Sequence, residues 1–302
     1  MRVISTRGLV SATASALTLV GTMALPTGAA TAQQFCNGRP ATVAGTNGDD
    51  TLTGTPGPDV IVGLGGNDTI SGDAGNDTIC GGGNDIVYGE AENAGISAAA
   101  GGNDTIKGGG GNDIVYGEFK NATGPLAAGA LGGADTIDGG VGADTVYGDI
   151  EKATITTVGV GAVFASDHLT GGIGADTIYG DIRDLTIKVV GAVTLGAGNN
   201  TINGGDGEDT VHGNFGTVTT GGPIISSGLS DTINGGEGSD TLYGDAKEGN
   251  TNLTPVAGGH SDTIDGGNGT DSGNAGPGTD SGNAGPGTDT CTNTEFVTNC
   301  EL

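Results

Sequence analysis

Aspartate recurs at a fixed place in a nine-residue pattern, and these carboxylates are the side chains best suited to chemistry. Consecutive blocks such as 45–53, 54–62 and 63–71 follow G-x-x-G-x-D-x-U-x, in which U is a large apolar residue. Eighteen of the 36 acidic residues occupy the sixth place, which a random acidic surface would not produce. We interpret this column as cation ligands. The aspartates predicted to bind metal are Asp50, Asp59, Asp68, Asp77, Asp85, Asp104, Asp113, Asp144, Asp176, Asp209, Asp240 and Asp271.

The residues around each aspartate favour calcium. Glycine at the first and fourth places allows positive φ and keeps side chains out of the turn, so that backbone carbonyl oxygens can point inward beside the carboxylate. Calcium takes about six to eight oxygen ligands, which is more than one short turn can supply. We therefore expect each ion to lie between the turns of two successive coils.

The rest of the pattern predicts the elements that hold these turns. Each unit has six turn residues followed by three strand residues, with U directed into the interior and β-branched residues suited to a pleated surface. If two units form one coil, the chain winds into a flattened solenoid. The sequence thus predicts an all-β fold, a right-handed parallel β-roll or β-helix solenoid with insertions on one edge.

Long insertions interrupt the pattern after Asp85, and they alternate with intact units, so all of them fall on one edge. On the other edge, which we call the intact edge, every aspartate follows a full G-G-x-G-x, as in residues 139–144. On the edge with insertions the turn signature decays, as at 165–167, so we expect weak or absent metal sites there in the middle of the chain. Two insertions, 154–164 and 185–195, alternate apolar and polar residues and predict strand pairs that extend the roll.

The repeats from residue 45 to about 292 resemble the hemolysin-type, or RTX (repeats-in-toxin), calcium-binding family. The resemblance implies a parallel β-roll with calcium ions in its turns. Three features depart from the family pattern: an N-terminal signal sequence, the lack of an accompanying catalytic or pore-forming domain, and the insertions on one edge.

Composition divides the chain into five segments. These are a signal peptide (1–32), an N-terminal segment with Cys36 (33–44), regular repeats (45–89), repeats with long inserts (90–265), and Gly-rich degenerate repeats with a Cys-closed C-terminal cap (266–302). The first segment has a basic start, an apolar run over 9–25 and a small-residue exit at 30–32, which predicts secretion to the extracellular space. A single membrane anchor is the alternative.

The net charge of −27 makes calcium ions the expected partners and argues against nucleic-acid binding and membrane insertion. In an exported chain, four cysteines predict two disulfides. Cys36 with Cys80 and Cys291 with Cys300 is the simplest of three pairings. Metal ligation by these thiols is a weaker alternative, because none of them forms a close C-x-x-C pair.

A second column follows U directly on the intact-edge units and is predicted to form an outward-facing ladder. Its members are Tyr88, Tyr116, Tyr147, Tyr179 and Tyr243, with His212 in the same place of the unit that lacks tyrosine. An acidic or amide residue follows two places after each. The ladder has two interpretations: stacking between coils that fixes their register, or a flat aromatic platform that binds polysaccharide or a cell surface.

No nucleophile, phosphate-binding or zinc-protease motif is present. The three histidines, His168, His212 and His260, lack ligand spacing, and we expect solvated positions for them. The sequence therefore predicts a secreted, non-catalytic calcium-binding repeat protein in which calcium binding is coupled to folding. The alternative is a cell-surface or matrix adhesin that binds polysaccharide through the tyrosine ladder or the inserts.

Overall fold

The computed structural model describes residues 32–94, 101–126, 129–158, 162–188, 193–220, 224–227, 230–244, 253–255, 262–269, 271–274, 281–287, 289–292 and 296–298. The chain divides into two units, Met1–Ala32 and Gln33–Leu302, and the fold described below is that of the second. Over these residues the structure contains strands and turns without helix, which confirms the all-β prediction. It follows that the described residues hold no apolar helix long enough to cross a bilayer.

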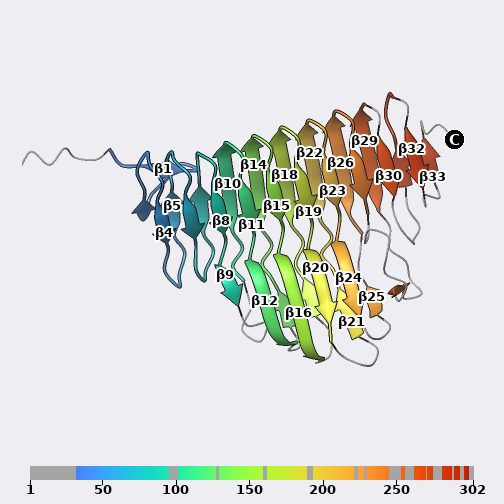
Figure 1. Cartoon of the computed structure of the whole chain (residues 1–302), viewed down its shortest axis with the longest axis horizontal. Coiled ribbons are helices and arrows are strands. Elements are labelled where there is room, and N and C mark those ends of the chain that lie inside the picture. Colours follow the sequence, from blue (N-terminus) through green and yellow to red (C-terminus); the bar gives the residue numbers. More distant parts are fainter. Residues whose placement is uncertain are drawn as a thin grey trace, which may run out of the picture. The chain divides into compact units, whose positions relative to one another are not determined.

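Two long parallel sheets form the repeat lobe, the part of the fold built from the nine-residue units (Figure 1). The first sheet contains, in spatial order, β3 (Val43–Ala44), β5 (Val60–Val62), β7 (Thr78–Cys80), β10 (Thr105–Gly110), β14 (Thr136–Val141), β18 (His168–Ile173), β22 (Thr201–Asp206), β26 (Thr232–Glu237), β29 (Thr263–Asn268), β31 (Ser281–Asn283) and β33 (Phe296–Thr298). The second contains β4 (Thr51–Thr53), β6 (Thr69–Ser71), β8 (Ile86–Tyr88), β11 (Ile114–Tyr116), β15 (Thr145–Tyr147), β19 (Thr177–Tyr179), β23 (Thr210–His212), β27 (Thr241–Tyr243), β30 (Ser272–Asn274) and β32 (Thr290–Thr292). Successive strands of each sheet come from successive coils, so the predicted parallel solenoid is confirmed.

The U residues form the core of the repeat lobe. Equivalent residues pair directly across coils, as Ile106 does with Ile137 and Val146 does with Ile178. These side chains are fully or almost fully buried in one continuous cluster between the two sheets. The cluster ends at Ile264, because Gly273 and Gly282 stand at the U place of the following units.

The insertions form a second lobe with its own core. Among the described residues, five of the insertions each add one strand to a third sheet, made of β9 (Ala91–Ala94), β12 (Phe119–Leu126), β16 (Ile150–Val158), β20 (Ile182–Ile187) and β24 (Phe215–Thr220). The fourth sheet contains β13 (Gly129–Leu131), β17 (Ala162–Phe164), β21 (Val193–Gly196), β25 (Ile224–Ser227) and β28 (Leu253–Pro255). We call these two sheets the insert lobe. They confirm the predicted strand pairs at 154–164 and 185–195 and extend them to neighbouring insertions.

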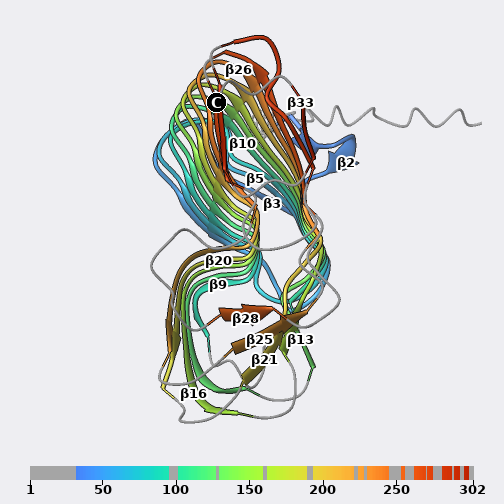
Figure 2. The ribbon, with the colours of Figure 1, turned by 90° about the vertical axis from the view of Figure 1, so that its right-hand side faces the viewer.

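The two lobes meet at a narrow waist, visible in the view along the stack (Figure 2). A coil that carries an insertion crosses the waist twice. In one coil the descending pass, residues 148–149, leads from β15 to β16, and the ascending pass, residues 165–167, leads from β17 to β18. Below the waist a cluster that includes Ile150, Phe164 and Phe215 fills the insert lobe.

A disulfide joins Cys36 to Cys80, as predicted, with a Cα–Cα distance of 5.8 Å. It ties the hairpin of β1 (Phe35–Cys36) and β2 (Arg39–Pro40) to β7. For the second predicted pair, Cys300 lies outside the described residues, so the pairing of Cys291 with Cys300 stays a prediction.

The tyrosine ladder stacks as predicted. Ring centroids lie 5.0 Å apart for Tyr88 and Tyr116 and 4.9 Å apart for Tyr116 and Tyr147. His212 continues the ladder, with its ring 4.7 Å from those of both Tyr179 and Tyr243. The aromatic rings therefore hold successive coils in register.

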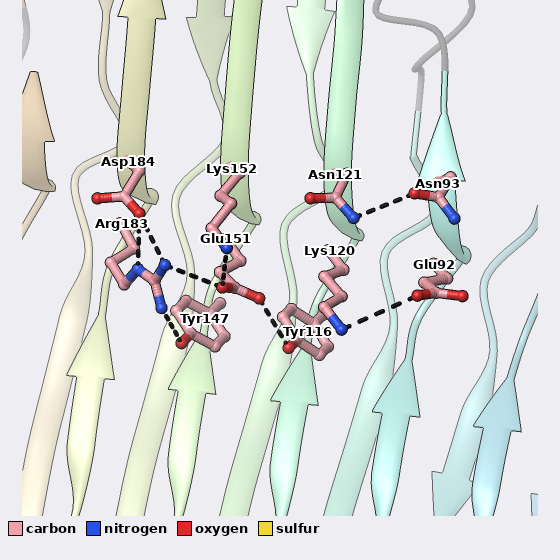
Figure 3. A network of polar contacts seen from close by, with 10 residues as sticks. All are labelled: Glu92, Asn93, Tyr116, Lys120, Asn121, Tyr147, Glu151, Lys152, Arg183 and Asp184. Atoms are coloured by element: carbon pink, nitrogen blue, oxygen red, sulfur yellow. Dashed lines mark hydrogen bonds and ion pairs between the residues drawn. The ribbon is translucent and has the colours of Figure 1, made fainter. Parts of the chain in front are cut away.

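The alternative interpretation, an exposed aromatic platform, does not fit the burial of three of the rings. Tyr88, Tyr116 and Tyr147 are only 3–5% exposed, and polar side chains from the insert lobe lie over Tyr116 and Tyr147 (Figure 3). The Tyr116 hydroxyl donates to Glu151 Oε2 at 3.0 Å, and Arg183 donates to the Tyr147 hydroxyl at 3.4 Å.

One of the three histidines also departs from its predicted solvated position. His212 is 3% exposed within the ladder. His168, by contrast, is exposed as predicted, and His260 lies outside the described residues.

The buried column generates a stability prediction. Ile178→Ala removes a fully buried side chain from the repeat core and should lower the free energy of unfolding by about 2–5 kcal/mol. The matched control is Ile173→Ala at a side chain that is 54% exposed, which should change it by only about 0.5 kcal/mol. Urea unfolding of the calcium-saturated protein measures both. Equal losses for the two variants would contradict the assigned core.

Candidate metal sites in the stacked turns

The predicted metal-binding aspartates lie in turns that glycine allows to stack. In the intact-edge turn 139–144, Gly140 and Gly142 have φ of +110° and +146°, a region that residues with a side chain rarely adopt. A Cβ at either glycine would collide with the backbone carbonyl of the equivalent turn in the preceding coil. The turns therefore pack backbone against backbone.

This packing aligns the aspartates into ladders. The backbone N–H of Asp113 donates to Asp144 Oδ1 at 2.8 Å, and that of Asp144 donates to Asp176 Oδ1 at 2.8 Å. The same bond repeats along both edges of the repeat lobe, from Asp50 on one edge and from Asp59 on the other. The carboxylate oxygen Oδ1 of each of these aspartates thus binds the backbone of the preceding coil.

The other carboxylate oxygen, Oδ2, has no hydrogen-bond partner at most of these positions although it is buried. It lacks one in Asp68, Asp77, Asp104, Asp113, Asp135, Asp144, Asp167, Asp176, Asp209, Asp240, Asp271 and Asp289. A buried, unpaired carboxylate oxygen is costly, so each of them calls for a positively charged or proton-donating partner.

A backbone carbonyl oxygen lies beside the orphaned carboxylate oxygen. A Cβ at Gly139 would lie 2.7 Å from Asp144 Oδ2 and 2.6 Å from the carbonyl oxygen of Gly171 in the next coil. A Cβ at Gly266 would lie 2.7 Å from Asp271 Oδ2 and 2.8 Å from the carbonyl oxygen of Ala284. The two oxygens therefore converge on one space, which any side chain at the first-place glycine would block.

Burial and mutual repulsion act on these carboxyl groups in the metal-free fold. Desolvation, together with the charges of neighbouring ladder carboxylates, raises the pKa of Asp113 and Asp176 to about 7. Desolvation raises the pKa of Asp77 and Asp240 to about 6. No ion pair found among the described residues involves a ladder aspartate. Protons or metal ions must therefore neutralise the ladders.

The donor set fits calcium. It consists only of carboxylate and carbonyl oxygens supplied by two stacked turns, as a hard cation with many oxygen ligands requires. Three predicted aspartates differ. Oδ2 of Asp50 and Asp59 accepts the backbone N–H of Thr46 and Thr55 at 2.6 Å, and Oδ2 of Asp85 accepts that of Gly83 at 3.2 Å.

The predicted set omits three aspartates that the structure places in the same environment. These are Asp135, Asp167 and Asp289, all buried with an orphaned Oδ2. Their place in the nine-residue repeat could have identified them as metal ligands. They were left out because their turns lack the full G-G-x-G-x motif or lie near the C-terminal end of the repeats. Weak metal binding on the edge with insertions stays a prediction, although its ladder is as continuous as that of the intact edge.

A comparison with curated proteins finds none that matches the chain. A comparison with protein families finds the RTX calcium-binding nonapeptide repeat, whose family model matches residues 44–79, 81–93, 98–119, 130–150, 165–182, 193–219 and 226–246. These segments make up more than half of the chain and contain most of the aspartate ladders. The chain therefore belongs to the RTX calcium-binding nonapeptide repeat family, and it is a calcium-binding repeat protein.

Proposed function

We propose that this chain is a secreted, non-catalytic protein whose solenoid folds when calcium enters the stacked turns. The observation that carries the proposal is the row of buried ladder carboxylates, most of which have one oxygen without a hydrogen-bond partner. Ionised carboxylates stacked in this way repel one another, and a calcium ion held by ladder carboxylates and turn carbonyl oxygens would neutralise their charge.

Coupling between calcium and folding follows from where the ligands come from. Each ligand set combines two coils, so it exists only after the coils have stacked. The free energy of calcium binding then adds to the free energy of folding, and the unfolded chain has no equivalent site.

Two features support export. The first 32 residues have the composition of a signal peptide. The Cys36–Cys80 disulfide is typical of an oxidising compartment outside the cytosol. An adhesin that binds polysaccharide on the tyrosine ladder gains no support, because Tyr88, Tyr116 and Tyr147 are buried.

Removal of calcium tests the coupling. We expect the chain with excess chelator to lose most of its strand signal in far-ultraviolet circular dichroism at neutral pH, and to regain it on addition of millimolar calcium. Magnesium at the same concentration is the control, since it is smaller and holds its water more tightly. Identical spectra with chelator and with calcium would refute the coupling.

Substitution of one ladder aspartate tests the site. Asp144→Asn keeps the oxygen that accepts the Asp113 N–H but removes the charge. It should raise the calcium concentration at half-saturation by about tenfold at the affected site, equal to about 1.4 kcal/mol. The control is Asp138→Asn, since the Asp138 side chain is 46% exposed and lies 4.0 Å from Lys107. Calorimetric titration compares them, and equal calcium binding by the two variants would contradict the assignment.

The raised pKa values predict an unusual pH dependence without calcium. The pKa of Asp113 rises from its ordinary 3.8 to about 7 in the fold, so the folded chain binds more protons than the unfolded chain between about pH 4 and pH 7. The free energy of unfolding of the metal-free chain should therefore fall as pH rises through this window. With saturating calcium the trend should reverse, because calcium binds the ionised form. Urea unfolding across this range, with and without chelator, measures both trends, and parallel trends would contradict the prediction.

A further inference from the structure

A second column of acids lies in the waist, outside the G-G-x-G-x-D turns of the intact edge. Each member follows the glycine that comes after a ladder aromatic, on the descending pass. The described members are Glu90, Glu118, Asp149, Asp181 and Asn214, at most 5% exposed. The next member, Asp245, lies outside the described residues.

These acids face the ascending pass across the waist. The backbone N–H groups of Gly102 and Gly133 donate to Oε1 of Glu90 and Glu118, and that of Gly198 donates to Asp181 Oδ1 at 3.3 Å. The remaining oxygen of each acid has no such donor. Every descending acid therefore points at the chain segment that returns from the insert lobe.

The centre of the waist brings three carboxylates together. Asp149 and Asp181 come from descending passes and Asp167 from an ascending pass, and one oxygen of each lies within 4.8 Å of one oxygen of the others. All three are at most 3% exposed. Both oxygens of Asp149 and Oδ2 of the other two lack any hydrogen-bond partner.

No cationic side chain among the described residues reaches these groups. The nearby Arg183 and Lys152 pair instead with Glu151 and Asp184, outside the waist (Figure 3). Burial raises the pKa of Asp149 well above its ordinary value, and the charges of Asp167 and Asp181 raise it further. The repulsion must be relieved by a cation or by protons.

Two asparagines show what this environment accepts. Asn200 takes the place of Asp167 one coil later, and its Nδ2 lies beside Gly180 as Asp167 Oδ2 lies beside Gly148. This Nδ2 donates to Asp181 Oδ1 at 3.3 Å and to the Gly213 carbonyl at 2.9 Å.

Asn214 repeats the arrangement on the descending pass. Its Nδ2 donates to Asp231 Oδ2 at 2.5 Å and to the Gly244 carbonyl at 3.4 Å. A proton-donating amide thus bridges a carboxylate and a glycine carbonyl in this coil. Where aspartate takes its place, oxygen faces oxygen, and only a positive centre can join them.

We propose that the waist binds divalent cations of the calcium class, held by carboxylates of both passes, with Asp149, Asp167 and Asp181 as one site. The ligands are all oxygens, as calcium prefers. The site goes beyond the ions proposed for the stacked turns, because Asp149 and Asp181 lie outside the aspartate ladders and only Asp167 belongs to one. A cation held there would join the descending and ascending passes of the chain across the waist.

The test counts calcium ions per chain by equilibrium dialysis of the full-length protein. Asp149→Asn with Asp181→Asn should bind at least one ion fewer than the unaltered chain while keeping its circular dichroism spectrum at saturating calcium. The matched control is Glu92→Gln with Asp138→Asn, which removes the same charge from side chains that are 57% and 46% exposed and should leave the count unchanged.

A reverse variant keeps the proposal testable if the first one fails to fold. Asn200→Asp with Asn214→Asp replaces the bridging amides by carboxylates and should bind at least one additional ion. An unchanged count in this variant, or in a folded Asp149→Asn, Asp181→Asn variant, would show that protons fill the waist and would overturn the proposal. A lack of calcium uptake by the unaltered chain would instead overturn the function proposed for the turns.

Discussion

Stacking in strict register is the constraint from which the rest of this structure follows. Each ladder aspartate donates its backbone N–H to the carboxylate of the aspartate in the next coil. The bond that holds the coils together therefore also places like charges above one another in a buried column. A solenoid of this kind cannot be stable through its backbone pairing alone, since every added coil adds another buried carboxylate.

The apolar cores of the two lobes are built from different side chains. The repeat core is one narrow column, because each nine-residue unit supplies a single U side chain and the turn residues supply almost no apolar side chains. The insert lobe is broader and uses aromatic residues such as Phe164 and Phe215, which meet edge to face. At the junction, the tyrosine ladder packs under Glu151 and Arg183, so an apolar stack with polar edges links the two cores.

The sequence predicts the side-chain positions that depend on a single nine-residue unit. It does not predict burial or contacts that depend on segments distant in the sequence. Ile178 and Asp144 could be assigned to core and turn, because a nine-residue period fixes which side of the strand or turn each faces. The period also predicts that Tyr147 faces away from the repeat core, which is correct. Its burial depends on Arg183, which lies 36 residues later on another strand. The repeat also predicts an acidic or amide residue two places after each ladder aromatic, such as Asp149. The contact of Asp149 with Asp167, however, depends on how the intervening insertion folds back.

At the waist, the first-place glycine and the sixth-place aspartate of a turn stay next to each other although an insertion separates them in the sequence. On the intact edge, one short segment supplies both the first-place glycine and the sixth-place aspartate. On the other edge, Gly148 and Asp167 are separated by β16 and β17, yet a Cβ at Gly148 would still meet the Asp167 carboxylate. Because the inserted strands pair with those of neighbouring coils, the chain returns to the point where it left. The insertion thus splits the turn into two passes without dispersing its ligands, and it leaves room for a second acid on the descending pass.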